Sequence, residues 1–405
     1  MSTATSLLAI GREVDDAESL GRAVDELLAS RAEPPTLLAL GEPTHGIESF
    51  PLLRNEILRH LVERGYRSIV LETDFFAAAA VDDYVTGGPA ELDTVLATGF
   101  SHGFGAVPGN RELVEWLREH NAGRAPQDQV RFHGFDAPLE FSGAPSPRRA
   151  LSSAVEYLPG ALRPESVRDL DALLGEDTDW TNPAAMFDAA ASIGDSDRAR
   201  ALRIVADDVA SALHRAAPGL RRADPAGYDH TVAHARTAQG LLRYHAAMAR
   251  PADDRIAILL SLRAEMMAEN LLALVAQERH RGPSLVFAHN ALLQRAQSDM
   301  PVDEDNVNSC SAGALVALTL GERYMFLATD GSPHSDPETL QGALAEATTR
   351  RALFPAPALR ATLPAAIDTG EPIVPGHIPL SPADTDGADA VIFIADTDGK
   401  QHRYW

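Results

Sequence analysis

The residues best suited to chemistry lie in one short loop, residues 41–46, with the sequence GEPTHG. Glu42 and His45 are three residues apart; Pro43 stiffens the backbone between them, and the flanking glycines permit sharp turns. A histidine titrates near neutrality and can take a proton from water or an alcohol, and a neighbouring carboxylate orients its ring. We therefore predict that His45 is a general base supported by Glu42. The alternative is that Glu42 and Thr44 only cap the following helix.

A second histidine has a similar setting. His289 and Asn290 directly follow the apolar run Leu285–Ala288, so two histidines from distant parts of the chain can face one cleft. The alternative for His289 is a core residue whose ring bonds a backbone carbonyl. Glu72 and Asp136 also end apolar runs, where each can orient a histidine or cap a helix.

Arg54 lies nine residues after His45, in the predicted helix Phe50–Glu63. At that position its guanidinium can hold a substrate anion or steady an oxyanion. A surface salt bridge is the alternative for Arg54.

A different hydrolase signature occurs at Gly99–Gly103, which matches GxSxG and could be completed by Asp330 and His334. A nucleophile elbow needs a buried strand before its serine and a helix directly after it. Here the preceding segment Glu91–Ala97 has a helical pattern, and glycine and proline interrupt Phe104–Asn110. The context therefore argues against a serine hydrolase.

Several cofactor chemistries lack the residues they need. Lys400 is the only lysine, which excludes a Schiff-base lysine, a Walker A lysine and a Ser-Lys dyad from the core of the chain. We predict no cofactor and no metal, because no HExxH or other closely spaced ligand pair occurs. The open alternative is a nitrogen and oxygen ligand set drawn from His45, Glu72, Asp136 and His289.

The elements that position these residues follow from short apolar runs that end in polar residues. Such runs lie at Leu37–Leu40, Ser68–Leu71, Val130–Gly134, Leu285–Ala288, Tyr324–Ala328 and Val391–Ile394. Helical patterns between the early runs indicate an α/β fold with a mostly parallel central sheet flanked by helices. In such sheets ligands bind beyond the carboxyl ends of the strands, where these polar residues gather.

The middle of the chain has helical periodicity and no strand pattern, most clearly in Arg198–Ala216, Thr231–Met248 and Asp254–Arg279. We predict an α/β core over residues 1–145 and 280–405, with a helical insertion over 146–279 that covers the cleft. The Pro- and Ala-rich segment Phe354–Pro382 is expected to lack regular structure.

Composition limits the partners. A formal charge of -23 repels phosphate backbones, so we expect no nucleic acid, and no segment approaches the length of a membrane span. The single cysteine, Cys310, permits no internal disulfide and suits the reducing cytoplasm. We expect a small-molecule substrate; the oligomeric state stays open.

Several blocks together resemble the erythromycin esterase family. They are Leu40–Gly46, the helix with Arg54, Val70–Glu72, Asp82–Val85, Asn110–Arg118, Phe132–Asp136, Met267–Asn270 and Ala288–Asn290. The resemblance implies a metal-independent esterase in which His45 activates water against a lactone carbonyl, with Glu42 and Glu72 orienting or tuning it. It also implies that Arg54 and His289 contact the substrate or the developing oxyanion. Asp136, Asn290, Asn110 and Arg263 are further candidates for substrate contact.

The sequence departs from the family pattern at two points. Leu292 stands where lactone-opening members usually carry a second histidine, as HNxH, and Arg263-Ala264 replaces a frequent Arg-Asp pair. We expect ester or lactone hydrolysis of a small natural product, in antibiotic biosynthesis or resistance. Leu292 favours one alternative, a cyclase or lyase with an internal nucleophile, because an apolar residue helps to exclude water. A third possibility is a binding protein that uses the same cleft.

Overall fold

The computed structural model describes residues 3–139, 143–302, 305–332, 335–397 and 400–403. The chain divides into two compact units, Met1–Phe135 with Leu271–Trp405, and Asp136–Asn270. Among the described residues, no helix combines the length and the apolar composition that crossing a membrane requires.

The first unit is built on an eight-stranded, mostly parallel sheet, which confirms the predicted α/β class. In spatial order the strands are β1 (Arg12–Glu13), β9 (Arg351–Pro355), β10 (Ala390–Ile394), β8 (Tyr324–Gly331), β2 (Leu37–Glu42), β5 (Ser284–His289), β3 (Ser68–Asp74) and β4 (Arg131–Asp136). β9 runs antiparallel to β1 and β10. The central strands β2, β5 and β8 are buried along their whole length, as expected of strands covered on both faces.

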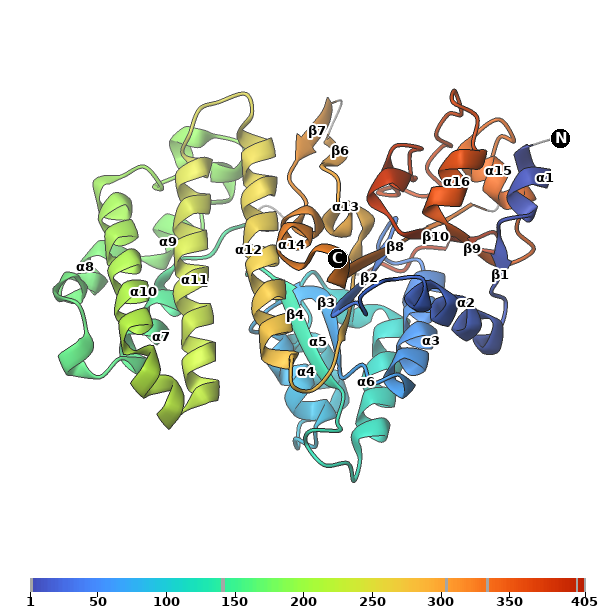
Figure 1. Ribbon diagram of the computed structural model, residues 1–405. Coiled ribbons are helices and arrows are strands. Elements are labelled where there is room, and N and C mark those ends of the chain that lie inside the picture. Colours follow the sequence, from blue (N-terminus) through green and yellow to red (C-terminus); the bar gives the residue numbers. More distant parts are fainter. Residues whose placement is uncertain (1–2, 140–142, 303–304, 333–334, 398–399, 404–405) are drawn as a thin grey trace. The chain divides into compact units, whose positions relative to one another are not determined.

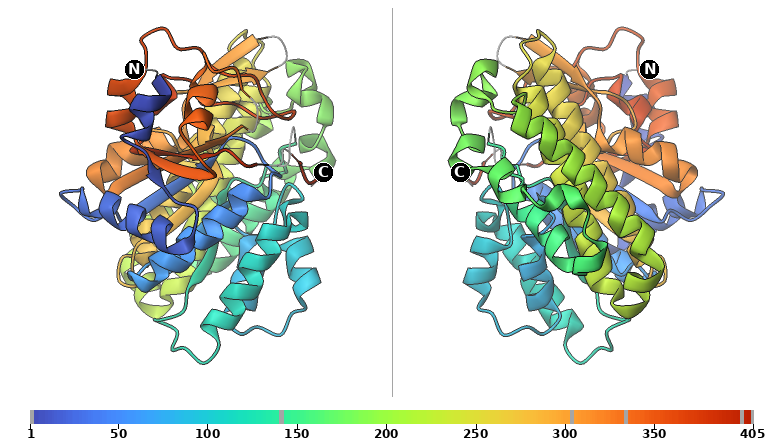
Figure 2. Two further views of the ribbon diagram at one scale, coloured as in Figure 1. Left: turned by 90° about the vertical axis from the view of Figure 1, so that its right-hand side faces the viewer. Right: turned by 90° about the vertical axis from the view of Figure 1, so that its left-hand side faces the viewer.

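Helices cover both faces of this sheet, with α3 and α6 on one side and α15 and α16 on the other (Figures 1 and 2). The helices of the unit are α1 (Thr3–Leu8), α2 (Ala17–Ala29), α3 (Ser49–Glu63), α4 (Ala78–Val85), α5 (Leu92–Thr98), α6 (Pro108–Asn121), α13 (Asn290–Leu293), α14 (Ala312–Leu320), α15 (Leu340–Glu346) and α16 (Ala356–Thr362), with 3₁₀ turns η1 (Phe104–Ala106), η6 (Gly321–Arg323) and η7 (Asp384–Gly387). Leu53, Ile57 and Leu61 lie on one stripe of α3 and are fully buried. Their burial anchors the helix that carries Arg54.

Apart from Asp136, the last residue of β4, the regular elements described in the second unit are helices and 3₁₀ turns. It contains α7 (Arg148–Tyr157), α8 (Leu170–Leu174), α9 (Asp177–Trp180), α10 (Asp197–Ala223), α11 (Pro225–Met248) and the start of α12 (Arg255–Glu278), with 3₁₀ turns η2 (Gly160–Leu162), η3 (Glu165–Val167), η4 (Pro183–Met186) and η5 (Ala189–Ala191). The long helices α10 and α11 pack side by side (Figure 1). Leu202, Val209 and Leu242 belong to a core of its own.

All six predicted strands are present, but other elements were missed. The expectation for Phe354–Pro382 was wrong, because the segment starts within β9 and contains α16. Pro357 occupies the first turn of α16, where proline is well tolerated, so its presence does not mark a loop. A hairpin of β6 (Ser298–Val302) and β7 (Asp305–Ser309) was also not predicted.

Candidate active site

Three of the predicted site residues come together because their strands are neighbours. β5 lies between β2 and β3, and Glu42 at the end of β2 pairs in register with His289 at the end of β5. Glu72 lies near the end of β3, and its Oε2 accepts a hydrogen bond from the backbone N–H of His289 at 3.0 Å. The carboxyl ends of the three strands therefore deliver two carboxylates and a histidine to one place.

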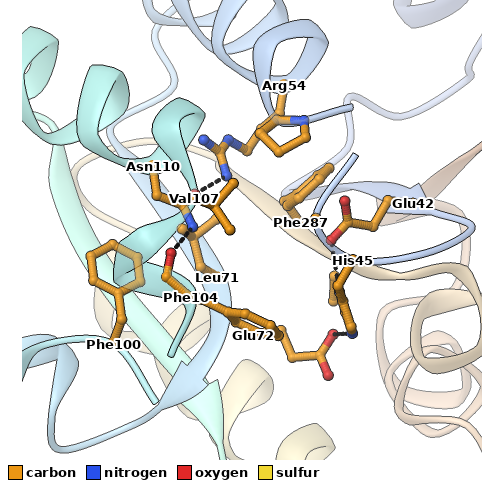
Figure 3. A pocket seen from close by; sticks show the side chains of 13 residues that line it. Glu42, His45, Arg54, Leu71, Glu72, Phe100, Phe104, Val107, Asn110 and Phe287 are labelled. Carbon is orange, nitrogen blue, oxygen red and sulfur yellow. Dashed lines mark hydrogen bonds and ion pairs between the residues drawn. The ribbon is translucent and has the colours of Figure 1, made fainter. Parts of the chain in front are cut away.

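His45 sits between the two carboxylates (Figure 3). Its Nδ1 lies 2.9 Å from Oε1 of Glu42, and its Nε2 lies 3.8 Å from Oε2 of Glu72. The ring centroid is 4.8 Å from that of Phe104 and 5.5 Å from that of His289. A carboxylate can only accept, so an ionised Glu42 requires the proton on Nδ1 and leaves the lone pair of the neutral ring on Nε2. That is the tautomer a general base needs.

Glu42 is held in an environment that disfavours its charge. Burial raises the pKa of Glu42, and the hydrogen bond and charge of His45 oppose that rise. In the described part of the chain its second oxygen, Oε2, has no hydrogen-bond partner. Glu42 therefore depends on His45 for stabilisation of its charge, which couples the protonation of the two residues.

His289 is engaged by the protein at both ring nitrogens. Its Nδ1 accepts the backbone N–H of Ala291 at 3.1 Å, so the proton is on Nε2, which donates to the carbonyl of Pro43 at 3.0 Å. Burial, and then the nearby His45, lower the pKa of His289 to about 4. These contacts favour the core-histidine alternative, and a direct role in catalysis stays a prediction.

Arg54 is 1% exposed, and no hydrogen bond to a carboxylate is found for it among the described residues. Its guanidinium donates to Oδ1 of Asn55, to Oδ1 of Asn110 at 2.7 Å and to the carbonyl of Gly109, and it lies over the ring of Phe287. Burial lowers the pKa of Arg54 to about 10, so it remains charged at neutral pH. The surface salt bridge considered for Arg54 is absent from the described structure.

A pocket connects these groups. Its cavity volume is about 30 Å³, within about 380 Å³ of empty space that includes open solvent. Its polar lining comes from residues that were predicted, and its apolar lining from a set that the sequence did not reveal (Figure 3). The polar group is Glu42, His45, Glu72, Arg54 and Asn110; the apolar group is Pro51, Leu71, Phe100, Phe104, Val107, Phe287 and Ala288. Glycine and proline in Phe104–Asn110 indicated that no helix directly follows Ser101, but not that this segment lies beside His45; it forms η1 and the start of α6.

Comparison with known proteins places this arrangement in a family. The model of the erythromycin esterase family matches residues 61–335, more than half of the chain. The chain belongs to the erythromycin esterase family. No curated protein matches it.

Three solved structures share the fold of this family member over nearly the whole of both chains. A Bacillus cereus protein has a TM-score of 0.72 at 16% identity, covering 97% of this chain and 96% of that one. A mutant of the erythromycin esterase EreC in its open conformation has a TM-score of 0.67 at 16% identity, covering 95% of each chain. A succinoglycan biosynthesis protein has a TM-score of 0.65 at 14% identity, covering 97% and 96%. At these identities the matches show the fold alone.

Two further predicted residues of this erythromycin esterase family member pair with each other. Asp136, at the end of β4, is fully buried and receives two hydrogen bonds from Arg263 on α12, at 3.0 and 2.6 Å. Their paired geometry is that of a bidentate carboxylate–guanidinium contact. Their predicted contact with substrate remains a prediction.

The side chain of Asn290 forms a hydrogen bond with strand β8 of the sheet. Its Nδ2 donates to the carbonyl of Thr329 on β8 at 2.7 Å, and a Cβ at Gly41 would come within 2.1 Å of its Oδ1. Close approach of Asn290 therefore requires glycine at position 41. Leu292, the departure from the family pattern, is half-buried in α13 and does not line the pocket.

The structure also bears on two alternatives from the sequence: the serine hydrolase suggested by the GxSxG match, and the metal-ligand set. Helix α5, not a strand, precedes Ser101, and the serine hydroxyl is buried against Thr73 and the backbone N–H of Asp74. His334 lies outside the described residues. Within the described ranges, no three His, Cys, Asp or Glu side chains are placed to hold a metal together, so the alternative ligand set gains no support.

Proposed function

We propose that the protein hydrolyses an ester or lactone of a small natural product, with His45 as general base and Glu42 as its orienting partner. The observation that carries the proposal is the hydrogen bond of 2.9 Å between Glu42 and Nδ1 of His45 at the wall of the pocket. It directs the basic nitrogen, Nε2, away from Glu42 and towards the side of the ring that faces Glu72.

In this mechanism Nε2 of His45 takes a proton from water while the water oxygen attacks the carbonyl carbon of the ester. The resulting imidazolium lies between the carboxylates of Glu42 and Glu72, which stabilise its charge. As the carbon–oxygen bond of the tetrahedral intermediate breaks, the imidazolium returns the proton to the leaving alkoxide. Glu72 is held for this purpose by the backbone N–H of His289.

Arg54 supplies positive potential at the pocket wall, where the oxyanion develops. Its donors are largely committed to Asn55, Gly109 and Asn110, so we assign it a field effect and the positioning of Asn110 rather than proton transfer. The cation is buried, so little water screens that potential.

The pocket suits an ester group with apolar neighbours. Phe100, Phe104 and Phe287 contribute to its wall, and its cavity volume of about 30 Å³ is far smaller than that of a typical small-molecule site. We infer that the pocket takes little more than the ester group, not a whole macrolide ring.

The test uses purified protein and a panel of linear esters, small lactones and a macrolide in H₂¹⁸O. We expect hydrolysis that places one ¹⁸O in the acid product and falls by about 10²–10⁴-fold in His45→Gln. Ser101→Ala is the matched control and should keep activity within about threefold, because Ser101 takes no part in the mechanism. A chelator should not reduce turnover. Full activity in His45→Gln would contradict the proposal.

The same experiment separates a second candidate, an internal nucleophile in place of water. The apolar wall at Phe104 and Phe287 favours this candidate because it limits access of water. It predicts a product without ¹⁸O: a cyclised product plus the free alcohol from a linear ester, or an isomer of unchanged mass from a lactone, again lost in His45→Gln. Ligand binding without turnover, unaffected by His45→Gln, would indicate the binding protein instead.

A further inference from the structure

The loop that carries His45 is held by hydrogen bonds to its backbone carbonyls from remote segments. The carbonyl of Pro43 accepts from Nε2 of His289 at 3.0 Å and from the backbone N–H of Ile378 at 2.9 Å. The carbonyl of His45 itself accepts from Nε2 of Gln401 at 2.9 Å. Because these acceptors are backbone atoms of the loop, the donors restrain its path directly.

The segment around Ile378 is anchored by a buried pair. Nε2 of His377 donates to Oδ1 of Asp330 at 3.0 Å, Nδ1 accepts the backbone N–H of Ile373 at 3.0 Å, and both side chains of the pair are fully buried. His377 ends a tight turn in which Gly376 has φ +80° and the N–H of His377 bonds the carbonyl of Val374. The turn therefore presents Ile378 to the active-site loop at a set position.

Asp330 ties that segment to the end of β8. Besides His377, its carboxylate accepts from Nε2 of Gln341 at 2.8 Å and from the backbone N–H groups of Gly331 and Leu380 at 2.8 and 2.9 Å. Leu380 is two residues from Ile378, so both sides of Ile378 are fastened to one carboxylate. The connection runs from Asp330 through His377 and Ile378 to Pro43.

A second connection comes from residues 401 and 402. The amide of Gln401 also lies 3.4 Å from the carbonyl of Pro375, and so bridges the turn before His377 to the His45 loop. The backbone N–H of His402 donates to the carbonyl of Gly46 at 2.8 Å, and Gln401 pairs with Ile47 in an antiparallel bridge. Gln401 thus contacts both the His45 loop and the turn that precedes His377.

We propose that Gln401 and the Asp330–His377 pair are positioning residues for His45, which keep its ring on Glu42 by holding the carbonyls of Pro43 and His45. The proposal rests on the proposed function of His45, but the geometry it describes exists without substrate. Loss of the donor at Gln401 leaves the His45 carbonyl with only the hydrogen bond of 3.4 Å from Oγ1 of Thr44. The ring then leaves Glu42 more often, and the base is productive for less of the time.

The test compares Gln401→Met, which removes the donor at similar length, with Lys400→Met at the exposed neighbouring residue. ¹⁵N-histidine NMR follows the Nδ1–H proton of His45, assigned by its loss in His45→Gln. We expect exchange of this proton with water to accelerate about tenfold in Gln401→Met and to stay within about twofold of wild type in Lys400→Met. With a substrate in hand, kcat should fall about tenfold in Gln401→Met at nearly constant KM.

Gln401→Lys restores a donor and should recover slow exchange. His377→Gln tests the buried pair, because its amide can still donate to Asp330, and we expect an intermediate exchange rate. A melting temperature that falls in Gln401→Met without any change in exchange or kcat would overturn the proposal, because Gln401 would then only stabilise the fold. If no ester is turned over by the wild type, the proposed function fails while the exchange measurement still decides this proposal.

Discussion

Two carboxylate–histidine pairs lie at the ends of the neighbouring strands β2 and β8, with nearly equal hydrogen bonds of 2.9 Å in Glu42–His45 and 3.0 Å in Asp330–His377. The two pairs differ in how many of their polar atoms have hydrogen-bond partners within the protein. Asp330 accepts four hydrogen bonds, and both ring nitrogens of His377 are bonded with no exposure. His45 is 22% exposed on the pocket, and Oε2 of Glu42 has no hydrogen-bond partner among the described residues.

The comparison teaches that residue types alone do not assign chemistry to such a pair. A fully satisfied buried network stabilises one structure, whereas a partly satisfied one costs stability and keeps a group available for reaction. Substitutions that neutralise the two carboxylates should therefore have opposite effects on stability.

Asp330→Asn is expected to have the largest effect, a loss of about 3–5 kcal/mol in the free energy of unfolding. The amide replaces an acceptor by a donor that faces the donors of His377, Gln341 and two backbone N–H groups. Chemical denaturation at pH 7 measures it. A loss below about 1 kcal/mol would show that the Asp330–His377 pair does not stabilise the fold.

Acid should weaken the structure through His289. Its pKa is about 4 in the folded protein against an ordinary value of 6.5 for histidine, so the unfolded chain binds the extra proton between these values. Stability is therefore retained above pH 6.5 and lost as the pH falls towards 4, by about 3 kcal/mol in total. Denaturation across this range should show a smaller pH slope in His289→Gln than in wild type; equal slopes would contradict the assignment.

Glu42→Gln should inactivate without destabilising. The pKa of Glu42 is raised by burial, so its ionised form costs stability at neutral pH and its removal should leave the free energy of unfolding unchanged or higher. The amide cannot stabilise the imidazolium of His45, and kcat should fall about a hundredfold. Kinetics and chemical denaturation of the same sample measure the fall in kcat and the change in the free energy of unfolding. Destabilisation as large as that of Asp330→Asn would remove the distinction between the pairs.

Leu292→His should have the smallest effect. It restores the histidine of the family pattern, but residue 292 does not line the pocket, so we expect kcat to change less than about threefold and stability by about 1 kcal/mol or less. A large gain in lactone hydrolysis would show instead that this residue reaches the substrate.

Much of the framework could be predicted from local patterns. Apolar runs such as Leu37–Leu40 must be buried on both faces, which requires a covered parallel sheet, and the polar residue after each run then falls at one edge. The same reasoning predicts that Glu42, Glu72 and His289 lie together, as they do in the structure. The helical pattern of Phe50–Glu63 likewise predicted the helix that carries Arg54, but not that Arg54 itself is buried.

The tertiary structure alone decided which of these groups are available for reaction. His45 and His289 both lie at strand ends. Both ring nitrogens of His289 form hydrogen bonds, with the backbone N–H of Ala291 and the carbonyl of Pro43, whereas the ring of His45 lies at the pocket beside Phe104 and Glu72. The sequence by itself determined the strand ends and the histidine that follows one of them at position 45. The hydrogen bonds that this loop receives, such as the one from Gln401 at 356 residues' separation, depend on contacts between segments whose pairing no local periodicity encodes, because hydrogen-bond partners are set by distance in space and not along the chain.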